Sequence, residues 1–112
     1  MRLEAQKYLF DIQQAADSIA RFTYEKSFAD YEADDMLRAA VEREFEIVGE
    51  ALSQLAQLDP AVADRISDYR RIIAFRNLLI HGYGQIDDRL VWDIVETKLP
   101  ALRQEVAALL GD

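Results

Sequence analysis

The segment DYRRIIAFRNLLIH, residues 68–81, decides the fold of this 112-residue chain. Its apolar residues cover most of the circumference of a helix: Ile72, Ile73, Phe75, Leu78, Leu79 and Ile80. A surface helix keeps its apolar residues on one stripe, so a helix of this kind must be buried on several sides. We therefore predict a helix that is central in its own chain or central to an oligomer. Ser67 or Asp68 can cap its start, and Gly82 and Gly84 end it.

Two amphipathic helices are predicted before this segment, because apolar residues recur there every three or four positions. They are Leu9, Ile12, Ala16, Ile19 and Thr23 in the first helix, and Leu37, Val41, Phe45, Val48, Leu52 and Leu55 in the second. The second helix runs to about Leu58. Between the two helices, TYEKSFADYEAD (residues 23–34) predicts a connection or a short irregular turn.

The remaining helices are marked by proline and aspartate. Asp59-Pro60 is a helix-start signal for a short helix around residues 61–66. Asp87 or Asp88 caps a last helix that carries Val91, Ile94 and Val95, and Pro100 either kinks this helix or starts a final one through Leu109. The sequence therefore predicts a single all-α domain, residues 1–112, built as a four- to five-helix bundle.

Composition restricts the chemistry that is available. The chain has no cysteine, which excludes a disulfide framework and a cysteine-based zinc site. We find no secretory signal and no apolar run of the roughly 20 residues needed to cross a bilayer, so we expect a cytoplasmic protein without a membrane partner. We also expect neither a metal site nor a cofactor.

The charge is unevenly distributed. The net charge of −8 argues against tight non-specific binding to nucleic acid. Residues 65–83, however, hold four arginines and one aspartate, a local charge of +3. Within this basic segment, Arg70 and Arg71 are candidate RNA contacts, although a solvated helix face with a chance excess of arginine is the alternative.

Four polar residues lie within or just after the apolar helix: Arg76, Asn77, His81 and Tyr83. His81 is the only histidine in the chain. A structural interpretation is that Arg76 and His81, as cations, interact favourably with the C-terminal end of the helix dipole. A functional interpretation is phosphodiester chemistry, because arginine binds phosphate with two N–H groups and histidine exchanges protons near neutral pH. An RNA 2′-hydroxyl can act as the internal nucleophile, so this chemistry requires no metal ion.

The spacing of Arg76 and His81 raises a difficulty. Five residues separate them by roughly 140° around a straight helix. They can meet one ligand only through the long arginine side chain, a distorted helix end or a second subunit. RNA cleavage also works best with both a base and an acid, and one chain holds one histidine. We therefore predict a homodimer whose cleft, at the two-fold interface, contains both His81 side chains.

The segment RNLLIHGY (residues 76–83) resembles the R-x4-H-x-Y motif of HepT-like proteins, a branch of the HEPN superfamily. The flanking segments AVEREFEIVGEAL (40–52), IIAF (72–75) and VWDIVETKLPALR (91–103) also resemble that family. The resemblance implies an all-helical, dimeric, metal-independent RNA endonuclease that acts as the toxin of a toxin–antitoxin pair. It implies that Arg76 and His81 are catalytic and that Asn77 supports them.

The same resemblance implies a regulatory partner. Tyr83 matches the tyrosine that the cognate antitoxin, a minimal nucleotidyltransferase (MntA-type), modifies with adenylate groups. AMP at Tyr83 would place bulk and negative charge beside the cleft and repel the RNA phosphate.

Two other functions are consistent with the same residues. One is a non-catalytic module that presents Arg76 and His81 to a nucleotide or to a partner nucleotidyltransferase. The other is a purely structural interaction bundle.

Other groups of side chains favour structural roles. We interpret Glu42, Glu46 and Glu50 as a solvated ladder, or as partners of Arg70 and Arg71 or of the antitoxin, rather than as a metal site. Phe45, Phe75 and Trp92 are predicted core residues. Tyr24, Phe28 and Tyr31 could line the cleft or pack beneath the loop.

Overall fold

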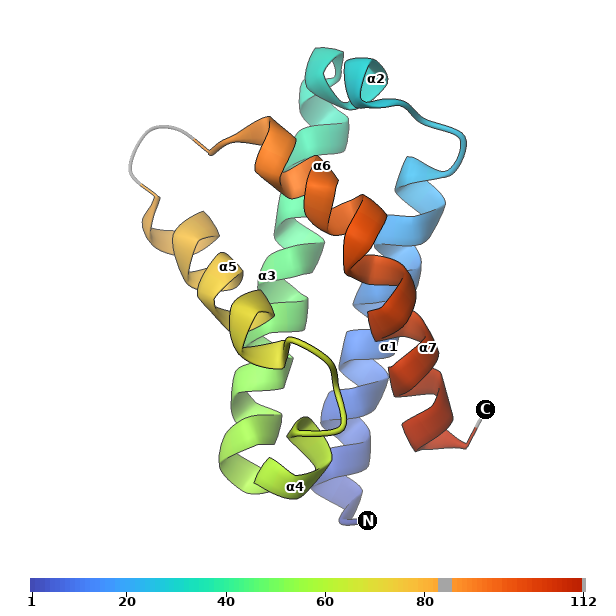
Figure 1. Ribbon diagram of the computed structural model, residues 1–112, viewed down its shortest axis with the longest axis vertical. Coiled ribbons are helices and arrows are strands. Elements are labelled where there is room, and N and C mark those ends of the chain that lie inside the picture. Colours follow the sequence, from blue (N-terminus) through green and yellow to red (C-terminus); the bar gives the residue numbers. More distant parts are fainter. Residues whose placement is uncertain (83–85, 112) are drawn as a thin grey trace.

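The computed structural model describes residues 1–82 and 86–111, and over these residues the chain is all-α, as predicted (Figure 1). Five helices have ten residues or more, and two short ones join them, which agrees with a bundle of four or five main helices. The helices are α1 (Leu3–Thr23), α2 (Phe28–Ala33), α3 (Asp35–Leu58), α4 (Pro60–Ala63), α5 (Tyr69–His81), α6 (Asp88–Thr97) and α7 (Leu99–Leu110).

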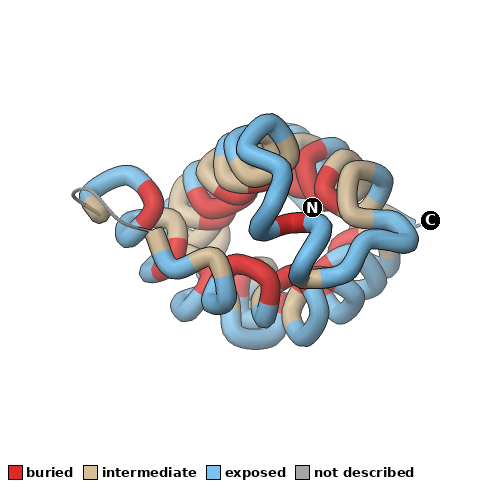
Figure 2. The backbone as a smooth tube through the Cα atoms, turned by 90° about the horizontal axis from the view of Figure 1, so that it is seen from above, coloured by how far each residue is buried: buried red, intermediate tan, exposed pale blue. Residues whose placement is uncertain are grey.

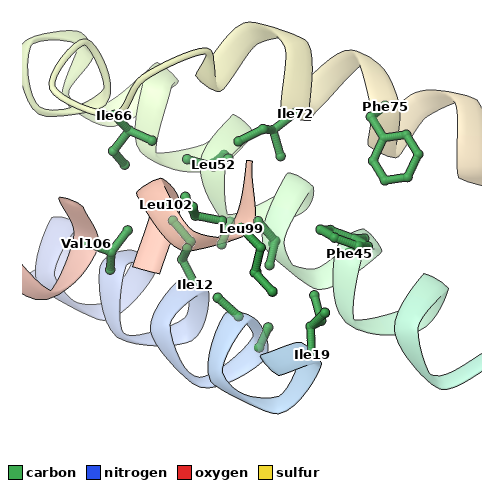
Figure 3. Close-up of a cluster of buried hydrophobic side chains, with 14 of the residues drawn as sticks. Ile12, Ile19, Phe45, Leu52, Ile66, Ile72, Phe75, Leu99, Leu102 and Val106 are labelled. Atoms are coloured by element: carbon green, nitrogen blue, oxygen red, sulfur yellow. The ribbon is translucent and has the colours of Figure 1, made fainter. Parts of the chain in front are cut away.

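Helix α3 is the centre of the bundle. It packs against α1 along its length and also against α2, α4 and α5, while α7 lies against α1. Side chains from α1, α3, α5 and α7 meet in one apolar core (Figure 3). The periodic residues predicted to face inward are buried in α1 and α3, apart from Thr23 and Leu37, which are half-buried. Seen from above, the buried positions lie on the inner sides of the helices (Figure 2).

Helix α5 is not central in its own chain, so that part of the prediction is wrong. Ile72, Phe75 and Leu79 are buried, and the Phe75 ring contacts Phe45 of α3 edge-on with 5.3 Å between ring centroids. Leu78 and Ile80, on other sides of the helix, are each 46% exposed. Helix α5 packs mainly against α3 and lies at the edge of the bundle (Figure 1). The other form of the prediction, a helix that is central to an oligomer, stays a prediction.

The predicted helix boundaries are largely confirmed. The Asp59 side chain accepts a hydrogen bond from the Val62 amide at the start of α4, and Asp87 caps α6 in the same way. Pro100 lies in the first turn of α7, so it starts a helix and does not kink one. Gly82 follows α5 with a negative φ of −76°, so it ends the helix without a left-handed conformation.

Asp68 precedes α5 but does not cap it with its side chain. Its φ of +58° is left-handed, and its carboxylate instead accepts a 2.6 Å hydrogen bond from Lys98 Nζ. This hydrogen bond, reinforced by the ammonium charge, lowers the pKa of Asp68. Ser67 is not the cap either, because its hydroxyl donates to Glu105. Both contacts join the start of α5 to α7.

The connection at residues 23–34 contains a helix that the sequence pattern did not predict. Helix α2 begins with a capping box, in which the Ser27 hydroxyl accepts from the Asp30 amide and the Asp30 carboxylate accepts from the Ser27 amide. Tyr31 is fully buried, with its ring 5.3 Å from that of Trp92, so it packs in the core. Phe28 is half-buried and Tyr24 is exposed.

Within the described part of the chain, none of the helices combines the length and the apolar character that crossing a bilayer requires.

Candidate functional site

Arg76 lies on the side of α5 that faces α3. Its side chain is 15% exposed, and its Nη1 is 3.3 Å from Oε2 of Glu50. Glu50 is in turn oriented by Gln54, one turn further along α3, whose amide donates to Oε1 at 3.1 Å. The guanidinium therefore lies beneath the surface with a carboxylate at one of its ends, and the carboxylate is the more exposed partner at 57%.

The backbones of α3 and α5 approach each other closely at this position. Gly49 is buried, and a Cβ added there would lie 2.2 Å from the Arg76 Cβ and 2.5 Å from its Cγ. Only a residue without a side chain fits such a gap. Arg76 Nε is also buried, and it has no hydrogen-bond partner among the described residues. The stem of Arg76 is thus fixed by packing and its end by an ion pair.

His81 and Asn77 share a different side of α5. They are four residues apart and both are exposed. Neither side chain forms a hydrogen bond or an ion pair within residues 1–82 and 86–111. His81 is the last residue of the helix. The structure thus brings Arg76 to Glu50 and leaves His81 open to solvent at the end of the same helix. A single chain does not bring the two predicted catalytic residues into contact.

Arg70 and Arg71 were the predicted RNA contacts. Arg70 and Arg71 are exposed in the first turn of α5, and the Arg70 guanidinium lies over the Tyr69 ring at 5.1 Å from its centroid. The proposed modification site, Tyr83, lies outside the described residues. Of the alternatives considered for the α3 glutamates, pairing with Arg70 or Arg71 is not found among the described residues, where Glu50 pairs with Arg76.

A groove of about 370 Å³ runs between α5 and α6, and Lys98 after α6 also lines it. Its lining is mainly apolar and includes Phe75, Leu78, Leu90 and Ile94, with Arg71 and Lys98 among its charged residues. Leu78 and Leu90 are 46% and 37% exposed. Exposed leucines beside a groove are typical of a surface that associates with another chain.

The acidic ladder on α3 does not form a metal site in the described residues, where no group of three potential ligands comes together. Glu42 is half-buried, and burial, with Asp88 as the next cause, raises the pKa of its carboxyl group. Phe45, Phe75 and Trp92 are 1%, 6% and 4% exposed, which confirms that they are core residues and not stacking platforms for bases.

Gly49 is a site residue that sequence reasoning missed, and the role of Glu50 beside Arg76 was missed as well, because Glu50 was interpreted as part of a solvated ladder or as a partner of other groups. The available signal was a glycine inside a strongly helical pattern. Glycine lowers helix stability, so its presence there indicates that close packing leaves no room for a side chain.

Comparisons with known proteins show which family the chain resembles. Residues 12–109 match the family model described as "Ribonuclease HepT-like". A "Probable ribonuclease HepT" from Thermococcus cleftensis is 33% identical over 107 residues, covering 92% of this chain and 93% of the relative. A protein of Methanocaldococcus jannaschii, named as a candidate RNase, is 32% identical over 103 residues, with 92% and 94% covered. Another candidate RNase, from Caldanaerobacter subterraneus, is 28% identical over 103 residues, with 92% and 91% covered. No solved structure gives a significant match.

Proposed function

Because this chain belongs to the HepT-like ribonuclease family, we propose that it cleaves RNA without a metal ion, using Arg76 and His81. The observation that carries the proposal is the contrast between these two residues on one helix. The Arg76 guanidinium is held against α3, whereas the His81 imidazole at the end of α5 is free to reach a ligand. A fixed cation and an accessible titratable group are the two parts that phosphodiester cleavage needs.

The chemistry is a transesterification within the RNA. The ribose 2′-oxygen attacks the adjacent phosphorus, the bond from phosphorus to the 5′-oxygen breaks, and a 2′,3′-cyclic phosphate forms. One histidine accepts the 2′-hydroxyl proton, and a second donates a proton to the leaving oxygen. Arg76 stabilises the charge that develops on the phosphoryl oxygens. Asn77, on the same side of α5 as His81, supports the substrate or the imidazole, and Arg70 and Arg71 contact neighbouring phosphates.

A homodimer would supply the second histidine. We propose that the exposed Leu78 of α5 and the adjoining groove face a second copy of the chain. In a two-fold dimer, His81 of each copy then enters a shared cleft, and each copy contributes one Arg76. This arrangement also accounts for the apolar circumference of residues 72–80, which the single chain leaves partly uncovered.

We further propose that the protein is a toxin neutralised by a minimal nucleotidyltransferase, which adds AMP to Tyr83. Tyr83 follows His81 by two residues, so an adenylate there would introduce negative charge next to the cleft and repel RNA. Co-expression with the transferase should give an intact mass increased by one or more AMP groups, and Tyr83→Phe should abolish the increase. Suppressed toxicity without added mass would contradict this part of the proposal.

The nuclease proposal is tested by incubating purified, unmodified protein with several RNAs in EDTA. Wild type should produce ends carrying a 2′,3′-cyclic phosphate or its hydrolysis product. His81→Ala and Arg76→Ala should each lower cleavage by at least about 100-fold, the usual contribution of a proton-transfer residue for His81 and of a charge-stabilising donor for Arg76. Lys7→Ala is the matched control, because Lys7 is an exposed cation on α1 whose contacts, with Asp11 and the Tyr8 ring, are both local.

The alternative function predicts a different result in the same assay. A non-catalytic binding module would leave every RNA intact, while His81→Ala and Arg76→Ala would weaken binding to a nucleotide or to the transferase. Circular dichroism and sedimentation of each variant separate loss of chemistry from loss of fold or dimer.

A further inference from the structure

We propose that Glu50 is a positioning residue for Arg76, and that Gln54, Glu50 and Arg76 form a chain of contacts that orients the guanidinium toward the scissile phosphate. The inference rests on the proposed nuclease function and adds to it two residues of α3. Neither Glu50 nor Gln54 belongs to the motif at residues 76–83.

The first step is that Arg76 is fixed at both ends. At the stem, α3 presents Gly49 where any side chain would overlap the Arg76 Cβ. At the tip, Glu50 Oε2 lies 3.3 Å from Nη1. Arginine has several rotatable bonds and loses considerable entropy when it is held in one rotamer. When these restraints are already present in the free protein, less of that cost remains to be met when substrate binds.

The second step concerns the other side of Glu50. Its Oε1 accepts a hydrogen bond from Gln54 at 3.1 Å, so the two carboxylate oxygens have different partners. Because both oxygens have partners, the carboxylate cannot rotate freely, and its orientation sets the orientation of the Arg76 guanidinium. Glu50 is 57% exposed, and an exposed ion pair with a single contact stabilises a protein only weakly. The arrangement is therefore better explained by orientation of Arg76 than by stability.

The third step is that the ion pair leaves Arg76 able to bind phosphate. A guanidinium has five N–H donors in a planar fork. The contact with Glu50 uses Nη1 and Nε is buried, so a phosphoryl oxygen would approach the donors of Nη2. The cost is electrostatic, because a carboxylate beside the cation weakens its attraction for a polyanion. If Glu50 positions Arg76, removing Glu50 should lower kcat but should not weaken the binding of RNA.

The experiment compares steady-state RNA cleavage by wild type, Glu50→Ala, Glu50→Gln and Gln54→Ala. We expect kcat to fall about 10-fold in Glu50→Ala, because misplacement of a catalytic group by about 1 Å can cost about 100-fold and Gly49 still restrains the Arg76 stem. Glu50→Gln and Gln54→Ala should show smaller losses. KM should stay constant or fall in Glu50→Ala, since a negative charge near the phosphate has been removed.

Glu46→Ala is the matched control. Glu46 lies one turn before Glu50 on α3, lines the same surface hollow as Glu50 and Gln54, and has no ion pair within the described residues. Its removal changes the net charge equally but should leave kcat unchanged. A purely structural role of Glu50 would lower the melting temperature and leave kcat of the folded fraction unchanged. A sequestering role, in which Glu50 competes with RNA for Arg76, would raise kcat/KM. Either result overturns the proposal.

A spectroscopic measurement separates this inference from the nuclease proposal itself. In protein labelled with ¹⁵N-arginine, the Arg76 guanidinium should rotate slowly in wild type and faster in Glu50→Ala, with no change in Glu46→Ala. If wild type cleaves RNA but Glu50→Ala keeps full kcat, positioning is wrong while the nuclease function stands. If wild type cleaves no RNA, the nuclease function is wrong. In that case, faster rotation in Glu50→Ala still supports the orienting role of Glu50, and unchanged rotation overturns it.

Discussion

Gly49 and Arg76 lie so close together that a Cβ on the glycine would be 2.2 Å from the Cβ of the arginine. Two atoms of this kind cannot approach to less than about 3.5 Å without repulsion. Each Cβ is bonded directly to the backbone of a packed helix, so neither atom can turn away as the end of a flexible side chain could. The closest approach of α3 and α5 therefore depends on the absence of a side chain at residue 49, next to the residue that pairs with Arg76.

Gly49→Ala should destabilise the protein, although alanine is the better helix former. The propensity gain is about 1 kcal/mol, whereas overpacking a closed contact costs about 1–3 kcal/mol and this overlap is severe. We expect a net loss of about 1–2 kcal/mol in urea unfolding, from the balance of the same two effects. RNA cleavage should also fall, because α5 must shift away from Glu50.

The control for this prediction places the residue without a side chain on α5 instead of α3. Gly49→Ala combined with Arg76→Gly removes the Arg76 Cβ and should recover part of the lost stability, despite a glycine inside α5. A double variant that is as unstable as the sum of its single changes would contradict direct overlap of these two residues.

Tyr31→Phe should stabilise the protein. The Tyr31 hydroxyl is buried and has no hydrogen-bond partner among the described residues, and burial, followed by Glu42 and Asp88, raises its pKa. Phenylalanine keeps the ring contact with Trp92 and removes the unsatisfied group, for a gain of about 1 kcal/mol. Thermal unfolding measures the effect. Tyr24→Phe, at a side chain that is 73% exposed, should change nothing. A loss of stability in Tyr31→Phe would show that the hydroxyl has a partner.

Glu42→Gln should stabilise the protein at neutral pH but not at acidic pH. Burial and the Asp88 carboxylate raise the pKa of Glu42 above its ordinary 4.5, so the folded state holds this proton more tightly than the unfolded state. Stability from this group is therefore present below pH 4.5 and is lost as the pH rises through the raised pKa. Melting temperatures of wild type and Glu42→Gln should coincide near pH 4 and separate toward pH 7. An equal difference at both pH values would contradict ionisation as the cause. Glu44→Gln controls for the general loss of a charge on α3, because Glu44 is not among the causes of the raised Glu42 pKa.

The sequence predicted the long helices well because each buries one apolar stripe, and spacing of three and four residues reports such a stripe directly. Leu9 to Ile19 and Val41 to Leu55 are buried as that spacing requires. Helix α2 was missed because six residues are too few to show a period. Its capping box at Ser27 and Asp30 was the only local signal.

The apolar segment at residues 72–80 shows where a single sequence is ambiguous. Its composition predicts burial on several sides but does not say whether the neighbouring surface belongs to the same chain. The Arg76–Glu50 contact was also out of reach, because it joins residues 26 positions apart whose approach depends on how α3 and α5 pack. Arg76, Asn77 and His81 were candidates because they are polar residues within an apolar helix, and the resemblance to the motif then implied their roles.

Leu78→Glu should convert the protein to a monomer. Leu78 is 46% exposed on the side of α5 that borders the groove, and Leu90 of α6 lies across the same groove. A carboxylate at the centre of an apolar interface would be buried without a partner, which two-fold symmetry repeats in both copies. Sedimentation at micromolar concentration should show one species at the monomer mass of 12.9 kDa. RNA cleavage should fall with it, because each chain keeps a single His81.

Leu3→Glu is the matched control for the dimer prediction. Leu3 starts α1, is 82% exposed and does not line the groove, so the same change of charge and side chain should leave both mass and cleavage unchanged. Leu90→Glu should reproduce the effect of Leu78→Glu from the opposite side of the groove. If wild type itself sediments as a monomer yet cleaves RNA, the second histidine is not required, and Arg76 and His81 must converge within one chain. If Leu78→Glu and Leu90→Glu both remain dimeric and active, the two copies meet on another surface.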